Sequence, residues 1–414
     1  MIQDQIHQKI VDNCDAVDQW FKKKSEGLAF PFYSSYDIRD SGLKVVPVDA
    51  NIFPAGFNNI CQQDKESAAQ VAFEYLKSHY TSVGQHIFLV AEEHTANPYY
   101  WENVNSIQKI LAGAGYEVLV CWPKTLEAPF EAQSMTGAKI MVYGSENKNG
   151  EIWSDGKKAD LIICNNDFSL SYPEWSLNLK TPMNPPHELG WYKRRKDEFF
   201  VQYNELAGEF SKLIGIAPEH MQVKTQRFDG FDVDDEKSRG ELADKVQTFI
   251  DELKVSYARL GIEQKPFVFL KNIAGTYGLA VVQVHDADEI RSWTYKSRKK
   301  MKAAKGGRDV ESLIIQEGIP TRFTTEAETA EPCVYMIGRK LVGGFLRTHN
   351  QKGPEESLNS PGAVYKKMCM SDLELNLSGC PMENVYGWMS KLSVLSIALE
   401  AKKAGVAFME YKGL

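Results

Sequence analysis

Apolar side chains at the start of the chain recur with the three- and four-residue spacing of one helix face. They lie at Ile6, Ile10, Val11, Cys14, Val17 and Phe21. The pattern predicts one amphipathic helix over residues 2–21, with its apolar face packed on a core. Residues 36–59 differ, because charged and amide side chains alternate there with proline and glycine. That pattern indicates a strand followed by a polar loop.

Short apolar runs bounded by polar residues follow, at residues 85–93, 116–123 and 159–167. Residues 101–115, which can form a helix, separate the first two runs, and this order predicts the strand–helix–strand unit of a parallel sheet. The third run ends in Asn165, Asn166 and Asp167. These polar side chains are binding-site candidates, because ligands of such sheets usually lie beyond the carboxyl ends of the strands.

The chain has 414 residues, which at about 150 residues per domain suggests two or three domains. Its composition changes near residue 183, where a proline-rich loop leads into a long amphipathic helix. We therefore expect an N-terminal parallel-sheet domain over residues 1–185 and a second domain over residues 186–414. The later apolar runs alternate with helical stretches, so the expected fold class is α/β, or α+β.

The charge balance limits the possible partners. The chain has 48 basic and 55 acidic residues, a formal net charge of −7, which repels nucleic-acid phosphates and anionic lipid surfaces. The sequence has no signal-peptide pattern at its start and no apolar run of the ~20 residues that span a bilayer. We expect a cytoplasmic protein that acts on small molecules, without nucleic acid or membrane partners, and the sequence does not indicate its oligomeric state.

A lysine followed by a glycine-containing loop is the most informative chemical feature. Lys271 ends an apolar strand, and the loop after it contains Gly275, Thr276, Tyr277 and Gly278. A lysine ammonium can bind phosphate oxygens, and a glycine loop lets backbone amides approach a polyphosphate closely. The two features together could bind ATP. A plain β-turn between two strands is the alternative.

A second feature lies about 45 residues further along the chain. The apolar run at residues 312–315 ends in Gln316, Glu317, Gly318 and Ile319. An adenine ring needs an apolar slot beside exposed backbone amide and carbonyl groups, and the end of such a strand can provide both. An ordinary strand end is the alternative.

This order of elements resembles the ATP-grasp superfamily, in which two α+β subdomains enclose ATP. The resemblance implies that Lys271 binds the nucleotide phosphates, that residues 275–278 cover them, and that residues 316–319 form the adenine hinge. It also implies that Arg347 and Asn359 contact the transferring phosphate. Mg²⁺ would accompany the ATP, and the candidate ligands for that ion are Glu331 and Asn359.

The resemblance extends to a narrower family. Residues 37–59, 163–169 and 190–200 are similar to the proteobacterial glutamate–cysteine ligase family, and the similarity covers most of the chain. The resemblance implies that ATP phosphorylates the γ-carboxylate of glutamate and that the amine of cysteine then displaces phosphate, giving γ-glutamylcysteine in the first step of glutathione synthesis. Such a reaction needs positioned cations more than a protein nucleophile, and Lys271 and Arg347 would be the catalytic cations.

Glutamate has two carboxylates and one ammonium, so its site should combine guanidinium, ammonium or amide donors with a carboxylate. Compatible side chains gather in two segments: Arg39, Lys44, Asp49, Asn51, Asn58 and Asn59 in the first, and Asn165, Asn166 and Asp167 in the second. Each could instead stabilise a loop by hydrogen bonds. Another carboxylate–amine ligase, or a nucleotide-binding protein without catalytic activity, remains an alternative, since fold does not fix substrate.

Overall fold

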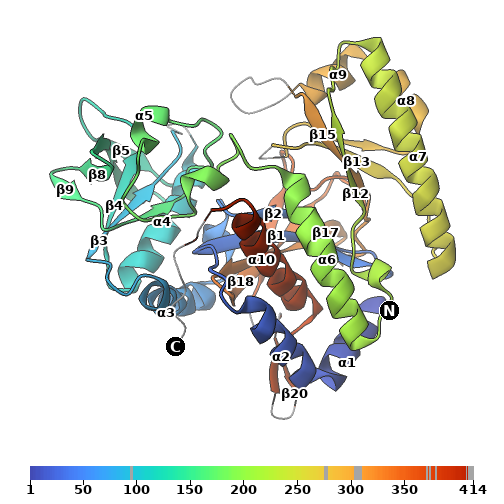
Figure 1. The fold of residues 1–414 in the computed structure, drawn as a ribbon, viewed down its shortest axis with the longest axis horizontal. Coiled ribbons are helices and arrows are strands. Elements are labelled where there is room, and N and C mark those ends of the chain that lie inside the picture. The colour runs from blue at the N-terminus through green and yellow to red at the C-terminus, as the bar shows by residue number, and fades with distance from the viewer. Residues whose placement is uncertain are drawn as a thin grey trace.

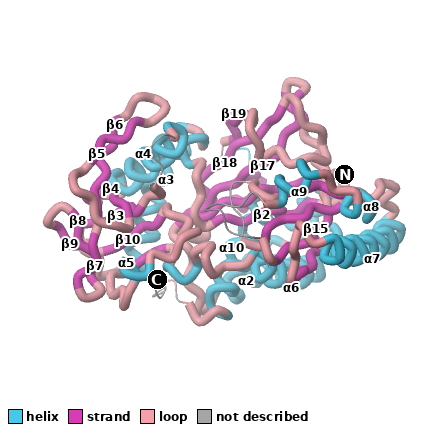
Figure 2. Tube along the Cα trace, turned by 90° about the horizontal axis from the view of Figure 1, so that it is seen from above, coloured by secondary structure: helices cyan, strands magenta, loops and turns pink. Residues whose placement is uncertain are grey.

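The computed structural model describes residues 1–93, 97–274, 278–302, 310–369, 372, 374–377, 380–406 and 408. It has a mixed α/β architecture that confirms the expected fold class, with a central antiparallel sheet flanked by a parallel sheet on one side and a small antiparallel sheet on the other (Figure 1). The view from above shows the same three parts in a row (Figure 2).

The central sheet joins strands from both ends of the chain. Its order is β19-β18-β17-β1-β2, and β16 pairs with the outer part of β17. The strands are β1 (Tyr33–Asp40), β2 (Val45–Asn51), β16 (Thr324–Thr325), β17 (Glu328–Ile337), β18 (Lys340–His349) and β19 (Val364–Met368). All neighbours are antiparallel, and Tyr36 pairs with Val334 between β1 and β17.

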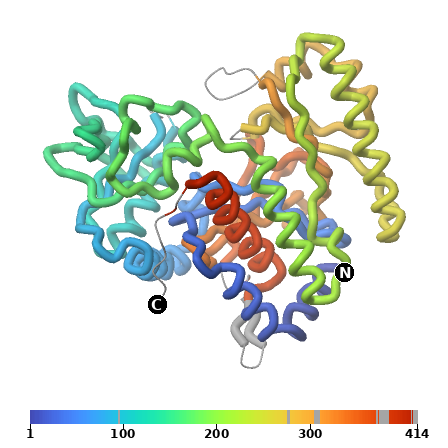
Figure 3. The backbone as a smooth tube through the Cα atoms, in the orientation of Figure 1, coloured from blue at the N-terminus to red at the C-terminus, as the bar shows by residue number. Residues whose placement is uncertain are grey.

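Two long helices cover one face of the central sheet. They are α6 (Lys196–Ile214) and α10 (Val385–Lys403), which pack on each other, and α10 also contacts β1, β2 and β17. The blue N-terminal helices and the red α10, from opposite ends of the chain, meet at this face (Figure 3). A buried bidentate ion pair between Arg194 and Glu400, with distances of 2.8 and 2.9 Å, ties the start of α6 to the last turns of α10.

The opening segment forms two helices rather than the single helix that its spacing predicts. They are α1 (Ile2–Asp12) and α2 (Cys14–Ser25), separated at Asn13. The backbone of Asn13 has φ −117° and ψ 23°, and its side-chain amide donates to the carbonyl of Lys9 at 2.8 Å. Asparagine competes for helix hydrogen bonds in this way. Because of this break, the apolar faces of both helices, which include Ile6 and Phe21, pack into the same core.

The second sheet has the parallel arrangement that the apolar runs predict. Its order is β11-β10-β3-β4-β6-β5, with every pair parallel except β5–β6. The strands are β3 (His86–Val90), β4 (Glu117–Trp122), β5 (Phe130–Gln133), β6 (Lys139–Gly144), β10 (Leu161–Cys164) and β11 (Met183–Asn184). The helices α3 (Gln62–His79) and α4 (Pro98–Gly113) pack on each other beside it, and α3 also contacts β17 and β18 of the central sheet.

The third sheet is small and antiparallel, in the order β12-β15-β13-β14. The strands are β12 (Thr225–Asp229), β13 (Val268–Asn272), β14 (Val281–Val284) and β15 (Ser312–Glu317). The long helix α7 (Glu236–Leu260) packs its apolar side on this sheet. It begins at Asp235, whose side chain accepts from two backbone amides, and ends at Gly261 in the left-handed conformation, both common helix boundaries.

The remaining elements are short. They are η1 (Phe57–Asn59), β7 (Glu146–Lys148), β8 (Glu151–Ser154), β9 (Lys157–Lys158), α5 (Pro173–Ser176), η2 (His187–Leu189), η3 (Pro218–His220), α8 (Ala287–Arg291), α9 (Tyr295–Met301), β20 (Glu374–Leu377) and β21 (Cys380–Glu383). Within the described part of the chain, we find no helix with the length and apolar character that crossing a bilayer requires.

The division of the chain at residue 185 stays a prediction. The strand pairing connects the two predicted domains in one sheet. Strands β1 and β2 lie before that point, yet they pair in one sheet with β17, β18 and β19, which lie after it. The sheet that faces the small antiparallel sheet therefore contains residues from both predicted domains.

Candidate active site

A small cavity lies between the central sheet and the small antiparallel sheet, and Lys271 lines it. Its lining comes from β1, β2 and β17 on one side and from β13 and β14 on the other. The Lys271 ammonium donates to the side-chain oxygen of Gln316 at 2.6 Å and to the carbonyl of Val48 at 2.9 Å. The lysine therefore joins the two sheets at the cavity wall.

Burial makes this lysine chemically unusual. Its side chain is only 8% exposed, and desolvation lowers the pKa of Lys271 to about 8, although Asp49 acts in the opposite direction. Asp49 forms an ion pair of 2.7 Å with Lys196 at the start of α6. Burial alone would raise the pKa of Asp49, but Lys196 and Lys271 outweigh it and keep that pKa below its usual value. Two lysines and one carboxylate thus share this wall.

Next to Lys271, two arginines and two carboxylates form one buried network across β1, β17 and β18. Arg347 donates to Asp37 at 2.7 and 3.2 Å and to Glu331 at 2.7 Å. Arg39 pairs with the other oxygen of Glu331 at 2.5 Å. The surrounding carboxylates raise the pKa of Arg347 even though burial works against its charge. Its Nε atom is buried and has no hydrogen-bond partner in the described part of the chain.

Arg39 also fixes the loop that follows β18. Its guanidinium donates to the carbonyls of Pro354 and Glu356, each at 2.9 Å. Ser357 and Asn359, a few residues further on, line the small cavity. Arg39 therefore positions this wall, in addition to lining the cavity itself.

The predicted hinge residues lie at the end of β15. Gln316 is bonded to Lys271, and Ile319 lines the cavity. The amide of Glu317 donates to Lys224 and that of Gly318 to Phe267, at 2.9 and 2.8 Å, so those two amides are engaged within the chain.

The side chain of Glu317 is engaged in contacts within the chain. It is buried and accepts from Lys44 at 2.5 Å and from the hydroxyl of Tyr257 at 3.0 Å. Lys44 therefore secures the end of β15 to the turn between β1 and β2. Sequence reasoning grouped this lysine with the substrate residues, and the structure places it in that buried pair.

The predicted phosphate loop is only partly described. Gly275, Thr276 and Tyr277 lie outside the described residues. Gly278 has φ +68°, and a Cβ there would lie 2.5 Å from the carbonyl oxygen of Asn359. Both Gly278 and Asn359 line the small cavity, so the loop after β13 lies directly against the segment that follows β18.

A larger cavity, about 1010 Å³ in volume, adjoins the small one. Asp37, Asp49, Lys196 and Asn359 line both cavities. Arg347 and Trp191 line the larger one. The wall that separates the two cavities therefore contains carboxylate, ammonium and amide groups.

Apart from Arg39 and Lys44, the candidate substrate residues divide into two groups. Five of them line the larger cavity, namely Asp49, Asn51, Asn58, Asn59 and Asp167. Asn165 and Asn166 instead support the fold. The amide of Asn165 donates to Tyr33 and to Pro54, both at 2.9 Å, and accepts from Asn103 at 3.0 Å. Asn166 donates to the carbonyl of Ala91 at 3.2 Å.

Sequence reasoning missed two residues that line both cavities. Asp37 precedes Arg39 by two positions on a strand, a spacing that places both side chains on one face, and that signal could have identified it. Lys196 has no comparable signal. Lys196 reaches the cavity because the start of α6 lies against the small antiparallel sheet. There its backbone amide donates to the carbonyl of Ile273 at 2.9 Å.

The oxygen donors at this wall have the chemistry that Mg²⁺ requires. Asp37, Asp49, Glu331 and Asn359 all line the small cavity. Carboxylate and amide oxygens are ligands of the hard type that Mg²⁺ prefers, usually together with water and substrate phosphates. The residues present therefore fit this ion, although both oxygens of Glu331 and both oxygens of Asp37 are paired with arginines.

Comparisons with known proteins identify the class as a carboxylate–amine ligase. The glutamate-cysteine ligase (GshA) family matches residues 7–401. A Methylobacillus flagellatus protein assigned as a gamma-glutamylcysteine synthetase has a similar crystal structure, with a TM-score of 0.86, 30% identity, and coverage of 97% of this chain and 96% of that one. This chain belongs to the glutamate–cysteine ligase family, whose reaction joins glutamate to cysteine with ATP.

Two solved structures are more distantly similar. They are D-alanyl-alanine synthetase A from Vibrio cholerae, with a TM-score of 0.32, 14% identity and coverage of 76% and 82%, and a glutathione synthetase-like effector from Globodera pallida, with a TM-score of 0.37, 11% identity and coverage of 87% and 84%. Among curated protein sequences the search found no match.

Proposed function

We propose that the two adjoining cavities form the active site of this glutamate–cysteine ligase, with the ATP phosphates on the Lys271 side and the amino-acid substrates in the larger cavity. The observation that carries the proposal is the shared wall. Asp37, Asp49, Lys196 and Asn359 line both cavities, so a phosphoryl group on one side and a carboxylate on the other would meet there.

In the first step, an oxygen of the glutamate γ-carboxylate attacks the γ-phosphorus of ATP and ADP leaves. Both reactants are anions, so the step depends on cations that hold them together. Lys271 and Arg347 have this role in the proposal, because their charged groups lie on the two sides of the shared wall. The unpartnered Nε donor of Arg347 could bind an oxygen of the reacting groups after a small side-chain movement.

In the second step, the cysteine amine attacks the γ-carbonyl carbon, the C–O bond to phosphate breaks, and the amine loses a proton. An acyl phosphate also reacts with water, so the site must exclude water between the steps. We assign that role to the loop with Gly278, because it already lies against Asn359.

A bound Mg²⁺ would neutralise phosphate charge as the phosphoryl group transfers. In the proposal Asp37, Glu331 and Asn359 hold it, because their oxygens line the small cavity or its wall. Glu331 would then be shared between the ion and its arginines.

The amino acids need acceptors as well as donors. The larger cavity offers amide groups at Asn58 and Asn59 and carboxylates at Glu92 and Asp167. We assign the amides to a substrate carboxylate and the carboxylates to a substrate ammonium, since opposite or hydrogen-bonding partners offset the cost of desolvating charged groups.

The small cavity has a volume of only about 50 Å³, which holds a few water molecules. A bound nucleotide therefore needs a wider cavity, and we propose that the small antiparallel sheet moves away from the central sheet to provide it. The contact between Lys271 and Val48 joins these sheets and would be replaced by a phosphate contact.

The test uses purified protein with ATP, Mg²⁺ and glutamate labelled with ¹⁸O in its γ-carboxylate. Cysteine should cause phosphate release, one ¹⁸O per turnover should appear in the phosphate, and the product should have the mass of γ-glutamylcysteine. Serine and alanine serve as matched amine acceptors. Phosphate release that does not depend on cysteine, or unlabelled phosphate, would contradict the proposed reaction.

A further inference from the structure

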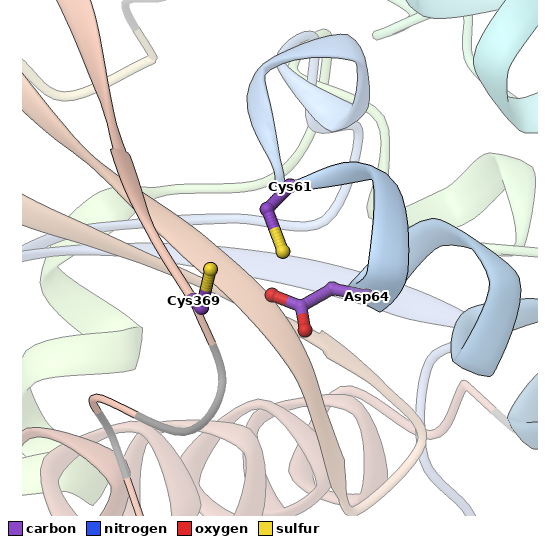
Figure 4. Close-up of side chains that lie close together, drawn as sticks. All are labelled: Cys61, Asp64 and Cys369. Carbon is purple, nitrogen blue, oxygen red and sulfur yellow. The ribbon is translucent and has the colours of Figure 1, made fainter.

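Two cysteines and one aspartate converge outside the cavities described above. Cys61 is the N-cap residue directly before α3, and Asp64 lies in the first turn of that helix. Cys369 directly follows β19. The two sulfur atoms and one carboxylate oxygen all lie within 4.8 Å of one another, and the three side chains face a common point (Figure 4).

We propose that Cys61, Asp64 and Cys369 form a binding site for a borderline-soft divalent cation, with Zn²⁺ as the ion that fits best. Zinc binds thiolates at about 2.3 Å and carboxylate oxygens at about 2.0–2.2 Å, so two ligand atoms of one tetrahedral ion lie about 3.6–3.8 Å apart. The present spacing needs only small side-chain movements to reach that geometry. Two sulfurs select zinc over Mg²⁺ or Ca²⁺, which prefer oxygen ligands.

Burial supports a preformed cluster rather than a chance meeting at the surface. Cys61 and Asp64 are each 6% exposed, and Cys369 is half-buried. A Cβ at Gly343 of β18 would lie 3.0 Å from the Asp64 carboxylate, so that strand limits where the carboxylate can move. The amide of Cys369 donates to the Asp372 carboxylate at 2.7 Å, which fixes the backbone that carries the second sulfur.

The charges around the cluster also suit a bound cation. Two thiolates and a carboxylate have three negative charges, and Zn²⁺ leaves one of them uncompensated. Lys367, on β19 two residues before Cys369, supplies a positive charge close to the cluster. The ligand set, the ion and Lys367 would together be neutral.

A disulfide between Cys61 and Cys369 is the competing interpretation. It would need the sulfurs to approach to about 2.05 Å and one of them to attack as a thiolate. The carboxylate of Asp64 lies within 4.8 Å of both sulfur atoms, and its negative charge disfavours a free thiolate there. A metal ion removes this penalty because it deprotonates a coordinating thiol outright.

A zinc ion bound to Cys61, Asp64 and Cys369 would affect the larger cavity from outside it. Asn58 and Asn59 of η1 precede Cys61, and Val364 and Tyr365 of β19 precede Cys369; all four line that cavity. The ion would tie these two segments together. Three protein ligands leave a fourth tetrahedral position for water.

The experiment uses the full chain, reduced and freed of metal with a chelator, and adds Zn²⁺ alone or Co²⁺ alone. We expect one tightly bound Zn²⁺ per chain, a sulfur-to-cobalt charge-transfer band with Co²⁺, and a rise in Tm with Zn²⁺. Cys61→Ser, Cys369→Ser and Asp64→Asn should each weaken zinc binding by about 100-fold or more. Cys121→Ala, a buried cysteine on β4, is the matched control and should bind as the unchanged chain does.

The proposal is overturned if the reduced chain binds no zinc, or if Cys61→Ser/Cys369→Ser retains the cobalt band and the full stoichiometry. It is also overturned if Cys61 and Cys369 form a disulfide in air that added Zn²⁺ does not prevent. Thermal unfolding without metal shows whether each variant folds, and Asp64→Asn, which preserves side-chain size, tests the site if a cysteine variant does not. None of these measurements depends on ligase activity.

Discussion

Lys271 donates a hydrogen bond of 2.6 Å to the side-chain oxygen of Gln316, on the adjacent strand of the same sheet. This contact joins the predicted phosphate lysine to the first residue of the predicted adenine hinge. The other amide atom of Gln316, Nε2, is buried and has no hydrogen-bond partner in the described residues. Gln316 thus orients the lysine and leaves a donor for a ligand group.

Replacement of Lys271 should remove ligase activity without unfolding the chain. We expect Lys271→Met to lower kcat/KM at least about 1,000-fold, because a preorganised cation at a phosphoryl-transfer site contributes several kcal/mol to transition-state stabilisation. Steady-state kinetics and circular dichroism measure the two effects. Lys254→Met, at an exposed position on α7, is the control and should have normal activity; a Lys271→Met protein with near-normal kcat/KM would show that the phosphates bind elsewhere.

The low pKa of Lys271 predicts how stability depends on pH. The value is about 8 in the folded chain and about 10.4 in an unfolded one. Between these values the unfolded chain binds a proton that the folded chain lacks, so the free energy of unfolding rises with pH in this window. The cost of burying the charge is present in full below pH 8 and is relieved as the pH approaches 10.4.

Urea unfolding of the wild type and of Lys271→Met can measure this effect. The stability of the variant relative to wild type should fall by on the order of 2–3 kcal/mol between pH 7 and pH 10. Nucleotide binding should weaken over the same range in the wild type alone, since only the ammonium form attracts phosphate. A stability difference that does not change with pH would show that the lysine is not desolvated.

The arginine–carboxylate network should not tolerate a lysine at position 347. Arg347 contacts both Asp37 and Glu331, and a lysine ammonium cannot reproduce this planar, forked set of donors. We expect Arg347→Lys to lower kcat/KM about 100-fold or more and stability by about 1–3 kcal/mol. Arg227→Lys, at a more exposed pair with Asp197 and Asp229, is the control and should change stability by less than about 1 kcal/mol.

Gly278 should be required for its small size as well as its backbone conformation. In Gly278→Ala the new Cβ would meet the Asn359 carbonyl at 2.5 Å, so the loop must move away from the cavity. We expect kcat to fall about 10-fold or more, as happens when a positioning element shifts by a fraction of an ångström.

Gly230→Ala separates the two effects of that substitution. Gly230 has φ +70°, but no atom lies within 4 Å of the position that a Cβ would take there, so alanine has the same backbone strain without the clash. Its stability should fall by a similar amount, about 1 kcal/mol, while its kcat should stay normal. Equal kcat values for the two variants would contradict a role for the Gly278–Asn359 contact.

The sequence predicts the local elements well and the long-range contacts poorly. Apolar spacing predicts the parallel sheet and the strand that ends in Lys271, because these patterns are local. The ion pair between Lys44 and Glu317 depends on strands that meet only in the folded chain. An isolated lysine in a polar loop has no pattern that distinguishes such a buried partner from a substrate ligand.

The candidate site shows the same limit. Asn165 follows an apolar strand, where ligands often lie, but its amide is engaged by Tyr33, Pro54 and Asn103. Position at a strand end therefore does not establish that an amide is available. Asp167, two residues later, lines the larger cavity, and only the fold distinguishes the two.

The pairing of β1 with β17 has a consequence for synthesis of the protein. The ribosome makes Tyr36 early, but its partner Val334 emerges only after most of the chain has been translated. Until then β1 lacks this partner strand, and unpaired strand edges are prone to association with other chains. The nascent protein should therefore depend on chaperones for longer than one whose first domain folds from contiguous residues.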